Sequence, residues 1–243
     1  MLTKKHFCFI IYLPLGKGGV FLNTKDKIIK TANVLFSEKG FDGTSVNDIA
    51  RVAKVNKPLI YYHFGSKDEL LDYILEDLIS SAEEVTIKIL REEKSKLIKE
   101  GKIKVESDKI EILNMSEEEI SKSMNYTLER IVDFYLERRN IIKVLVVESL
   151  KKNDRSNLMF EIVNVLNSKK VSKEMEEQNA NFIFDKEAMT ERYFIGFMPI
   201  ITFAIYFDEW SKNYDFQKKE LREFFLEKYL NSIGNAFLKE GGN

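Results

Sequence analysis

Two helix signals separated by a two-residue turn constrain this chain more than any other feature of its sequence. The run from Ser45 to Ala53 begins with the S-V-N-D pattern of a capping box and keeps its apolar residues on one helical face. Only Lys54 and Val55 separate it from Asn56, which can cap the next helix. Two helices joined by so short a turn, with Val55 to fill the corner, predict a helix-turn-helix.

The second helix, expected over residues 56–64, should present its polar groups outward. Ile60 and Phe64 are four residues apart and should face a small core. Their direction leaves the following side chains on the outer and flanking faces: Lys57, Leu59, Tyr61, Tyr62 and His63. Hydroxyl, imidazole and ammonium donors of this kind suit a helix that grips phosphate oxygens while its first residues reach base edges in the major groove.

Two further helices should complete this N-terminal unit. Residues 24–39 carry apolar side chains in helical order, with Thr24 able to cap the start and Gly40 able to end it. A second capping box, at Ser66 to Glu69, opens a helix that we expect to continue past residue 90.

Charge divides the chain unevenly. Residues 23–67 carry eight basic and four acidic side chains, whereas the residues after Lys67 carry 27 basic and 35 acidic ones. A basic unit therefore precedes an acidic one, although the net charge of the whole chain is only −1. We predict a helix-turn-helix DNA-binding domain at residues 22–68 and a larger helical domain at residues 69–243.

The composition predicts an all-α protein without catalytic or metal chemistry. Three prolines and 11 glycines in 243 residues, with runs rich in Lys, Glu, Ile and Leu, favour helices over sheets. Cys8 is the single cysteine, so we expect no disulfide framework and no cysteine-based metal site, and a reducing, cytoplasmic setting fits. Because His6 and His63 are the only histidines, we expect no metal, no cofactor and no enzyme activity.

Residues 1–21 form a leader that we expect to lie outside the folded protein. Its apolar run, residues 7–15, is far shorter than the roughly 20 residues that a membrane span needs, and no small-residue cleavage site is evident. Lys17-Gly18-Gly19 can be encoded as AAAGGAGG, a bacterial ribosome-binding sequence, so translation can begin at Leu22 or Val20. A genuine but disordered tail and a targeting segment are the alternatives.

Residues at fixed offsets between Gly40 and Leu70 form a long motif. Its members are Gly40, Phe41, Thr44, Ser45, Ile49, Ala50, Ala53, Val55, Asn56, Ile60, Tyr61, His63, Phe64, Ser66, Lys67 and Leu70. The motif resembles the TetR family of bacterial transcriptional regulators and covers about the N-terminal fifth of the chain. The resemblance implies a homodimer whose two N-terminal domains occupy adjacent major grooves of a palindromic operator, with a helical C-terminal domain that binds a small molecule.

The resemblance also implies roles for single residues. Phosphate contacts would fall to Thr44, Ser45, Tyr62, His63 and Lys67, and contacts with bases to Lys57, Pro58, Leu59 and Tyr61. The sequence departs from the family at Lys54, where glycine is usual, and at Pro58, where glycine is frequent. Proline is tolerated in a first helical turn but lacks an amide donor, so the base readout should change. Plainer interpretations remain open: Tyr61 can belong to the core, and His63, Arg51 and Lys54 can be ordinary surface residues.

The acidic remainder is expected to be helical with one interruption. Residues 101–113 alternate apolar and polar side chains, which predicts a small hairpin, and an irregular charged loop or a frayed helix is the alternative. A capping box at Ser116 and Glu119 opens the next helix. Helices are expected at residues 116–139, 141–151, 155–167, 171–179, 187–214 and 216–238.

The helix expected at residues 187–214 is the most apolar one. With no charge between Arg192 and Asp208 it should be buried on every side, which requires a partner subunit or a cavity. Pro199 should kink it, and pairing with the final helix across a two-fold axis would make a four-helix interface. Candidates for an effector pocket are Phe182, Tyr193, Phe194, Phe197, Met198, Phe203, Tyr206 and Trp210. The same aromatic stripe can equally be core or dimer interface.

Together with the resemblance to the TetR family, these patterns predict a ligand-responsive, DNA-binding transcriptional regulator that acts as a repressor. The expected partners are double-stranded operator DNA, a second copy of the chain and a small, largely apolar effector, with no membrane involved. A DNA-binding or partner-binding regulator without a small effector is the alternative.

Overall fold

The computed structural model describes residues 23–106, 109–151, 154–167, 171 and 186–240. This part of the chain is almost entirely helical, as the composition predicts. In chain order the elements are α1 (Thr24–Lys39), α2 (Val46–Ala53), α3 (Lys57–Phe64), α4 (Lys67–Lys99), β1 (Ile103–Glu106), β2 (Lys109–Ile112), α5 (Glu117–Glu137), α6 (Arg139–Ser149), α7 (Leu158–Val163), the 3-10 helix η1 (Asn164–Asn167), α9 (Lys186–Glu191), the π-helix η2 (Arg192–Phe197), α10 (Met198–Asn213) and α11 (Lys218–Glu240). The leader, nearly all of the helix expected at residues 171–179, and Phe182 lie outside the described residues.

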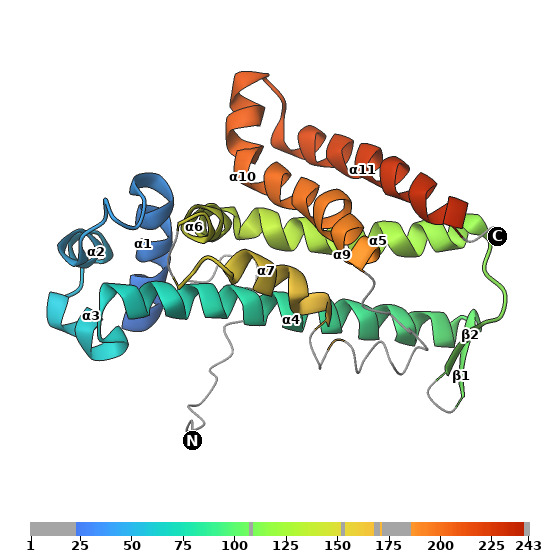
Figure 1. The fold of residues 1–243 in the computed structure, drawn as a ribbon, viewed down its shortest axis with the longest axis horizontal. Helices are drawn as coiled ribbons and strands as arrows, with labels where there is room; N and C mark the ends of the chain where they lie inside the picture. Colours follow the sequence, from blue (N-terminus) through green and yellow to red (C-terminus); the bar gives the residue numbers. More distant parts are fainter. Residues whose placement is uncertain (1–22, 107–108, 152–153, 168–170, 172–185, 241–243) are drawn as a thin grey trace.

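Helix α4 is the long axis of the molecule (Figure 1). Its 33 residues run from the three-helix unit α1–α3 to the hairpin of β1 and β2 at the opposite end. We refer to the elements from α5 to α11 as the body. Within it, α5 packs along α4, α6 packs on α1, and α10 and α11 contact α5. One continuous core cluster includes residues from both α1–α3 and the body, so the domain boundary expected at residue 68 stays a prediction.

The hairpin expected within residues 101–113 is present. Strands β1 and β2 pair antiparallel, with Ile103 opposite Ile112 and Glu106 opposite Lys109. Ile103 is buried, and β1 contacts α4. The alternation of apolar and polar residues therefore correctly predicts a strand pair, which buries one apolar side chain next to α4. The interpretations as a loop or a frayed helix are wrong.

The helix caps agree with expectation in part. The capping box at Ser116 and Glu119 is complete. At α1, Asn23 rather than Thr24 is the cap, since its side chain accepts the Asp26 amide at 2.9 Å. Ser66 accepts the Glu69 amide at 3.0 Å, but its own amide donates to the Phe64 carbonyl, so the predicted second box is only half formed.

The helix expected at residues 187–214 is interrupted at its middle. The π-helix η2 ends directly before Met198, whose amide donates to the Tyr193 carbonyl five residues earlier. Pro199 follows in the first turn of α10 and has no amide to offer the Ile195 carbonyl. The kink expected at Pro199 is therefore taken up by a wider turn just before it.

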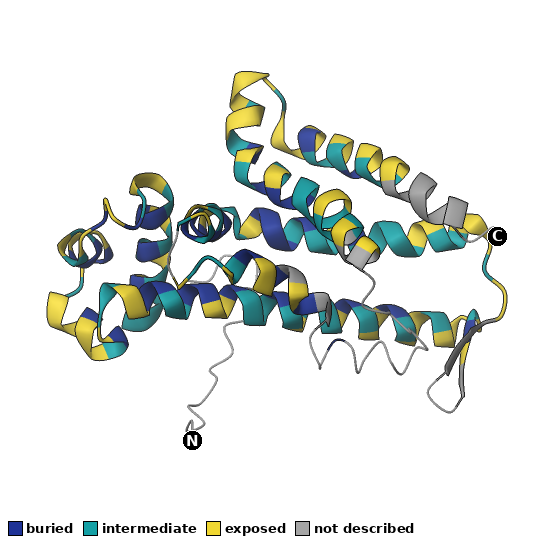
Figure 2. Cartoon of the chain, in the orientation of Figure 1, coloured by how far each residue is buried: buried dark blue, intermediate teal, exposed yellow. Residues whose placement is uncertain are grey.

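The same helix is not buried on every side, contrary to expectation. Five of its large apolar residues are between 49% and 64% exposed, namely Phe194, Ile195, Tyr206, Trp210 and Tyr214. One face packs on α5, α6 and α11, and the opposite face is open in a single chain (Figure 2). No helix in the described part of the chain is long and apolar enough to cross a membrane.

Candidate DNA interface

Helix α2 is anchored at its first turn by the predicted capping box. The Ser45 hydroxyl accepts the Asp48 amide at 3.1 Å, and the Asp48 carboxylate accepts the Ser45 amide at 3.2 Å. Hydrogen bonds from Ser45, and then from Arg51 at 3.0 Å, lower the pKa of Asp48 to about 2. Ser45 is exposed, but its hydroxyl and its amide both donate to the Asp48 carboxylate, so its phosphate role stays a prediction.

The turn between α2 and α3 depends on an unusual backbone conformation at Lys54. This residue ends α2 with φ 55° and ψ 45°, in the left-handed region, and its amide bonds back to the last turn of α2. Glycine adopts this conformation freely, which explains why relatives usually have glycine here. Val55 follows and packs against the core at the corner, as expected.

Helix α3 presents the predicted outward face. Ile60 is fully buried and Phe64 nearly so, whereas Tyr62 is 82% and Tyr61 43% exposed. The alternative that Tyr61 belongs to the core is therefore wrong for this chain. Four neighbouring residues complete the face: Lys57, Pro58 and Leu59 are exposed and His63 is half-buried. Asn56 is the cap by position, but its side chain makes no capping hydrogen bond.

Thr44 does not lie on this face. Its side chain is 1% exposed, and its hydroxyl lies 2.8 Å from the Gly40 carbonyl oxygen and 3.1 Å from that of Leu35. Its amide donates to the Phe41 carbonyl. The expectation that Thr44 contacts phosphate is wrong, because both of its donors are used inside the protein. Thr44 instead closes the loop between α1 and α2.

Lys67 also contacts this loop. Its ammonium donates to the Phe41 carbonyl at 2.9 Å and to the Thr44 carbonyl at 3.0 Å, and it lies 4.1 Å from the centre of the Phe41 ring. Since an ammonium has three donors, at most one remains for a phosphate. The phosphate role of Lys67 stays a prediction, and the structure shows a structural role that the motif alone did not reveal.

Comparison with known proteins agrees with this geometry. The family model for bacterial regulatory proteins of the tetR family matches residues 28–74. Residues 28–74 are a TetR-family N-terminal domain. The biofilm operon icaADBC HTH-type negative transcriptional regulator IcaR of Staphylococcus aureus is 52% identical over 48 residues, which are 20% of this chain and 26% of the relative. The match thus spans about a quarter of the relative's length.

Two solved structures share the fold over most of the chain. A proposed fatty acid metabolism regulator from Clostridium perfringens has a TM-score of 0.53 at 20% identity, over 84% of this chain and 97% of that one. A proposed TetR-family transcriptional regulator from Mesorhizobium loti has a TM-score of 0.53 at 14% identity, over 86% of this chain and 96% of that one. At these identities the likeness concerns the fold alone, and it includes the body.

The predicted effector residues do not converge on one cavity in the body. Phe203 stacks on Phe225 of α11 with ring centres 3.8 Å apart, and Phe197 meets Tyr135 of α5 edge-on at 5.4 Å. Tyr193 stacks on Phe160 of α7 at 5.8 Å. Met198 is half-buried against the core. The remaining described candidates, Phe194, Tyr206 and Trp210, point outward.

Tyr135 is an aromatic residue of this region that sequence reasoning missed. It is buried on α5 beside Phe197, and burial raises the pKa of its hydroxyl. Its place on an amphipathic helix suggested only a core residue. A buried phenol beside the effector candidates makes it a further candidate contact.

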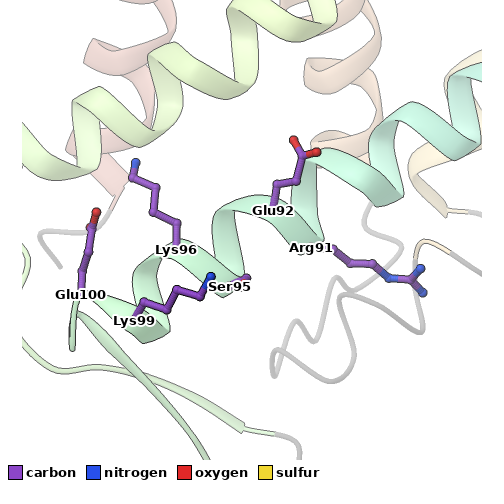
Figure 3. Close-up of a pocket in the computed structure, with 6 residues that line it drawn as sticks. All are labelled: Arg91, Glu92, Ser95, Lys96, Lys99 and Glu100. Atoms are coloured by element: carbon purple, nitrogen blue, oxygen red, sulfur yellow. The ribbon is translucent and has the colours of Figure 1, made fainter.

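Two shallow hollows lie at the surface, one on α4 and one on the body. One of about 550 Å³ lies near the far end of α4 and is lined by Arg91, Glu92, Ser95, Lys96, Lys99 and Glu100, with none of the predicted aromatic residues (Figure 3). Another of about 490 Å³, beside α9 and η2, includes Phe194. The described residues contain no group of acidic, histidine or cysteine side chains suited to a metal.

Proposed function

We propose that this chain is a transcriptional repressor that binds operator DNA through α3. The observation that carries the proposal is the outward face of α3, where Tyr61 and Tyr62 are exposed beside Lys57 while Ile60 is buried. Phosphates and base edges accept hydrogen bonds from hydroxyl and ammonium donors. The excess of basic residues at 23–67 favours the same partner. A relative that shares this domain is named a negative regulator, which supports repression over activation.

The functional unit is a homodimer on a palindromic operator. In support, Ile195, Tyr206 and Trp210 recur at helical spacing along η2 and α10 and are exposed in the single chain. Large apolar side chains left exposed together favour an interaction site. A two-fold axis at this face would place two copies of α3 on one side of the duplex, and half-sites one helical turn apart would match them.

Release from DNA follows when a small, largely apolar molecule binds the body. Two recognition helices fit an operator only at one separation, so a ligand that prefers another separation lowers the affinity in proportion to its differential binding. Helix α4 runs without a break from the N-terminal domain along the body. A movement of the body on ligand binding can therefore be transmitted through α4 to the N-terminal domain. Tyr193 and Phe197 on η2, with Tyr135, are the candidate contacts.

Selection of bound duplexes from a random DNA pool tests the proposal. Tyr62→Phe should weaken binding to every duplex by about fivefold, because one hydroxyl-to-phosphate hydrogen bond is worth about 1 kcal/mol. Lys57→Ala should instead relax the preference at one base position. Tyr214→Phe is the matched control, since Tyr214 is also exposed but lies on the body, and its affinity should not change.

The outcomes separate the claims. A purified protein that ignores every duplex at low ionic strength overturns the DNA function. Equal behaviour of the Tyr62 and Lys57 variants overturns only the roles assigned to these residues. Thermal shifts with a panel of apolar and cationic compounds distinguish a ligand-responsive repressor from a regulator without a small effector, since only the former should be stabilised by one of them.

A further inference from the structure

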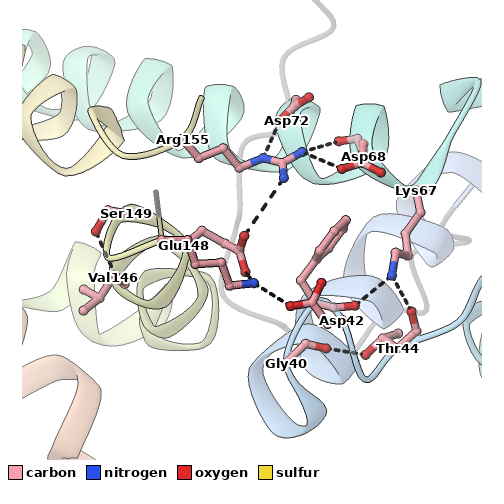
Figure 4. A network of polar contacts seen from close by, with 12 residues as sticks. Gly40, Asp42, Thr44, Lys67, Asp68, Asp72, Val146, Glu148, Ser149 and Arg155 are labelled. Atoms are coloured by element: carbon pink, nitrogen blue, oxygen red, sulfur yellow. Dashed lines mark hydrogen bonds and ion pairs between the residues drawn. The ribbon is translucent and has the colours of Figure 1, made fainter. Parts of the chain in front are cut away.

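A cluster of charges lies where the three-helix unit α1–α3, here the reader domain, meets the body (Figure 4). Its centre is the turn between α6 and α7, which carries Lys151 and Arg155. This turn faces both the loop between α1 and α2 and the first turns of α4. Neither Lys151 nor Arg155 belongs to the motif of residues 40–70, and the proposed DNA contact does not use them.

Glu148, near the end of α6, is the buried anion that holds these two cations. Its side chain is 1% exposed. Lys151 donates to one carboxylate oxygen at 2.7 Å, and Nη1 of Arg155 faces the other at 4.0 Å. Because an isolated buried carboxylate is strongly unfavourable, Glu148 needs both cations close by. Lys151 and Arg155 are thereby fixed on the body side of the boundary.

Both cations also donate to carboxylates outside the body. Arg155 donates to Asp72 at 2.8 Å and to Asp68 at 3.1 Å, both on the first turns of α4. Lys151 donates to Asp42, in the loop between α1 and α2, at 2.8 Å. The buried carboxylate of Glu148 thus positions Lys151 and Arg155. These two side chains bind two different segments, the loop between α1 and α2 and the first turns of α4.

Phe41 of the same loop is the apolar part of the contact. Its ring is buried, and the guanidinium carbon of Arg155 lies 5.2 Å from the ring centre, with Lys151 at 5.9 Å on the body side and Lys67 at 4.1 Å. Cations at these distances are attracted to an aromatic face. Arg155 therefore contacts the reader domain through the Phe41 ring and the start of α4 through the carboxylates of Asp68 and Asp72.

The contact made by these charged side chains can open without disturbing the rest of the core. A hollow of about 640 Å³ lies between the two parts here, lined by Phe41, Leu75, Leu158 and the charged side chains. Charged groups around a partly open hollow can separate and pair again without repacking apolar side chains. By contrast, α4 joins the parts through continuous backbone and α1 joins α6 by direct contact.

We propose that Glu148, Lys151 and Arg155 form an electrostatic clasp through which the body orients the reader domain. Closed, the clasp holds the loop at Phe41 and Asp42 and the start of α4. It is a further connection beside α4 and the contact of α1 with α6, and it makes the orientation of α3 depend on the α6–α7 turn. Its consequence for DNA rests on the proposed function: an open clasp leaves less of the protein in the orientation that fits an operator.

Hydrogen exchange on the full chain tests the clasp without DNA or effector. In Arg155→Ala, amides of residues 41–64 should exchange at least threefold faster than in the parent protein, while those of α5 and α10 keep their rates. Asp42→Asn removes one exposed partner and should give a smaller shift at the same residues. This second variant keeps the test decisive if the first one fails to fold. Affinity for a selected operator should fall in the same order.

Arg222→Ala is the matched control. Arg222 makes a two-pronged pair with Asp133, at 2.5 and 2.8 Å, that ties α11 to α5 within the body. Its loss should speed exchange there and leave residues 41–64 unchanged. The clasp is refuted when both clasp variants retain parental exchange at residues 41–64, or when Arg222→Ala speeds it equally. A parent protein that binds no DNA would remove the proposed function and leave this exchange result intact.

Discussion

At the scale of single residues, the backbone conformation of Lys54 costs free energy, and the fold tolerates this cost. Its left-handed conformation, with φ 55°, crowds the β-carbon of any residue other than glycine. The turn between α2 and α3 is only a few residues long, so the chain has no other place to reverse. The Lys54 amide still donates a hydrogen bond to the last turn of α2, and this bond stabilises the left-handed conformation.

Replacing Lys54 with glycine should therefore stabilise the protein. We expect Lys54→Gly to raise the free energy of unfolding by about 0.5–1 kcal/mol, since the relief of the left-handed strain exceeds the extra freedom of glycine in the unfolded chain. Urea titration would measure it. Lys54→Ala keeps the β-carbon and should give no such gain, and equal stability of the two variants would contradict the explanation.

At the scale of elements, the first turn of α2 gains stability from a charge that forms only above a certain pH. Asp48 accepts hydrogen bonds from Ser45 and Arg51, which favour its ionised form and lower its pKa from 3.8 to about 2. A lowered pKa in the folded state means that the stabilisation is complete above the unfolded value and is lost as pH falls toward the folded one. The relevant window is therefore between about pH 4 and pH 2.

Asp48→Asn should lower the free energy of unfolding at pH 6, and this difference should shrink as pH falls through that window. Chemical unfolding at a series of pH values would follow it. Arg51→Gln is the comparison, because it removes only the smaller cause and should retain most of the pH dependence. A difference that stays constant down to pH 2 would mean that the ionised carboxylate is not what stabilises the turn.

At the scale of the whole molecule, ion pairs join α10 to α6, and the aromatic face of α10 lies outward. Lys143 of α6 donates to Glu209 at 2.7 Å, and Arg139 pairs with Asp208. Asp208 and Glu209 come directly after the buried inner face of α10, which includes Ile201, Ala204 and Phe207. Tyr206 and Trp210 lie on the exposed side of the helix. An apolar face left exposed in this way favours a second copy as its cover.

A charge at this face should prevent assembly. Trp210→Glu is expected to convert the dimer to a monomer in sedimentation experiments, with unchanged helix content, because it places an unpaired carboxylate in the interface. Ile98→Glu serves as the control, since Ile98 is similarly exposed but lies near the far end of α4. A parent protein that sediments as a monomer would refute the dimer, and a Trp210 variant that stays dimeric would place the interface elsewhere.

Interactions between residues close together in the sequence made much of this protein's secondary structure predictable. Capping boxes, apolar periodicity and alternation concern residues within a few positions of one another, and they correctly predicted the helix-turn-helix, the hairpin and the outward face of α3. The effector candidates were predicted less well, because an aromatic stripe describes burial without saying whether core, ligand or partner provides it.

The tertiary structure alone decided the roles that depend on distant residues. Lys67 meets a carbonyl 26 residues earlier in the chain, and Lys151 meets Asp42 across 109 residues. No spacing rule reaches that far, since such contacts arise only when packed helices bring the segments together. The buried hydroxyl of Thr44 belongs to the same class. The sequence by itself thus determined the helices and their faces, and the folding of one part against another determined which side chains remain free to reach DNA.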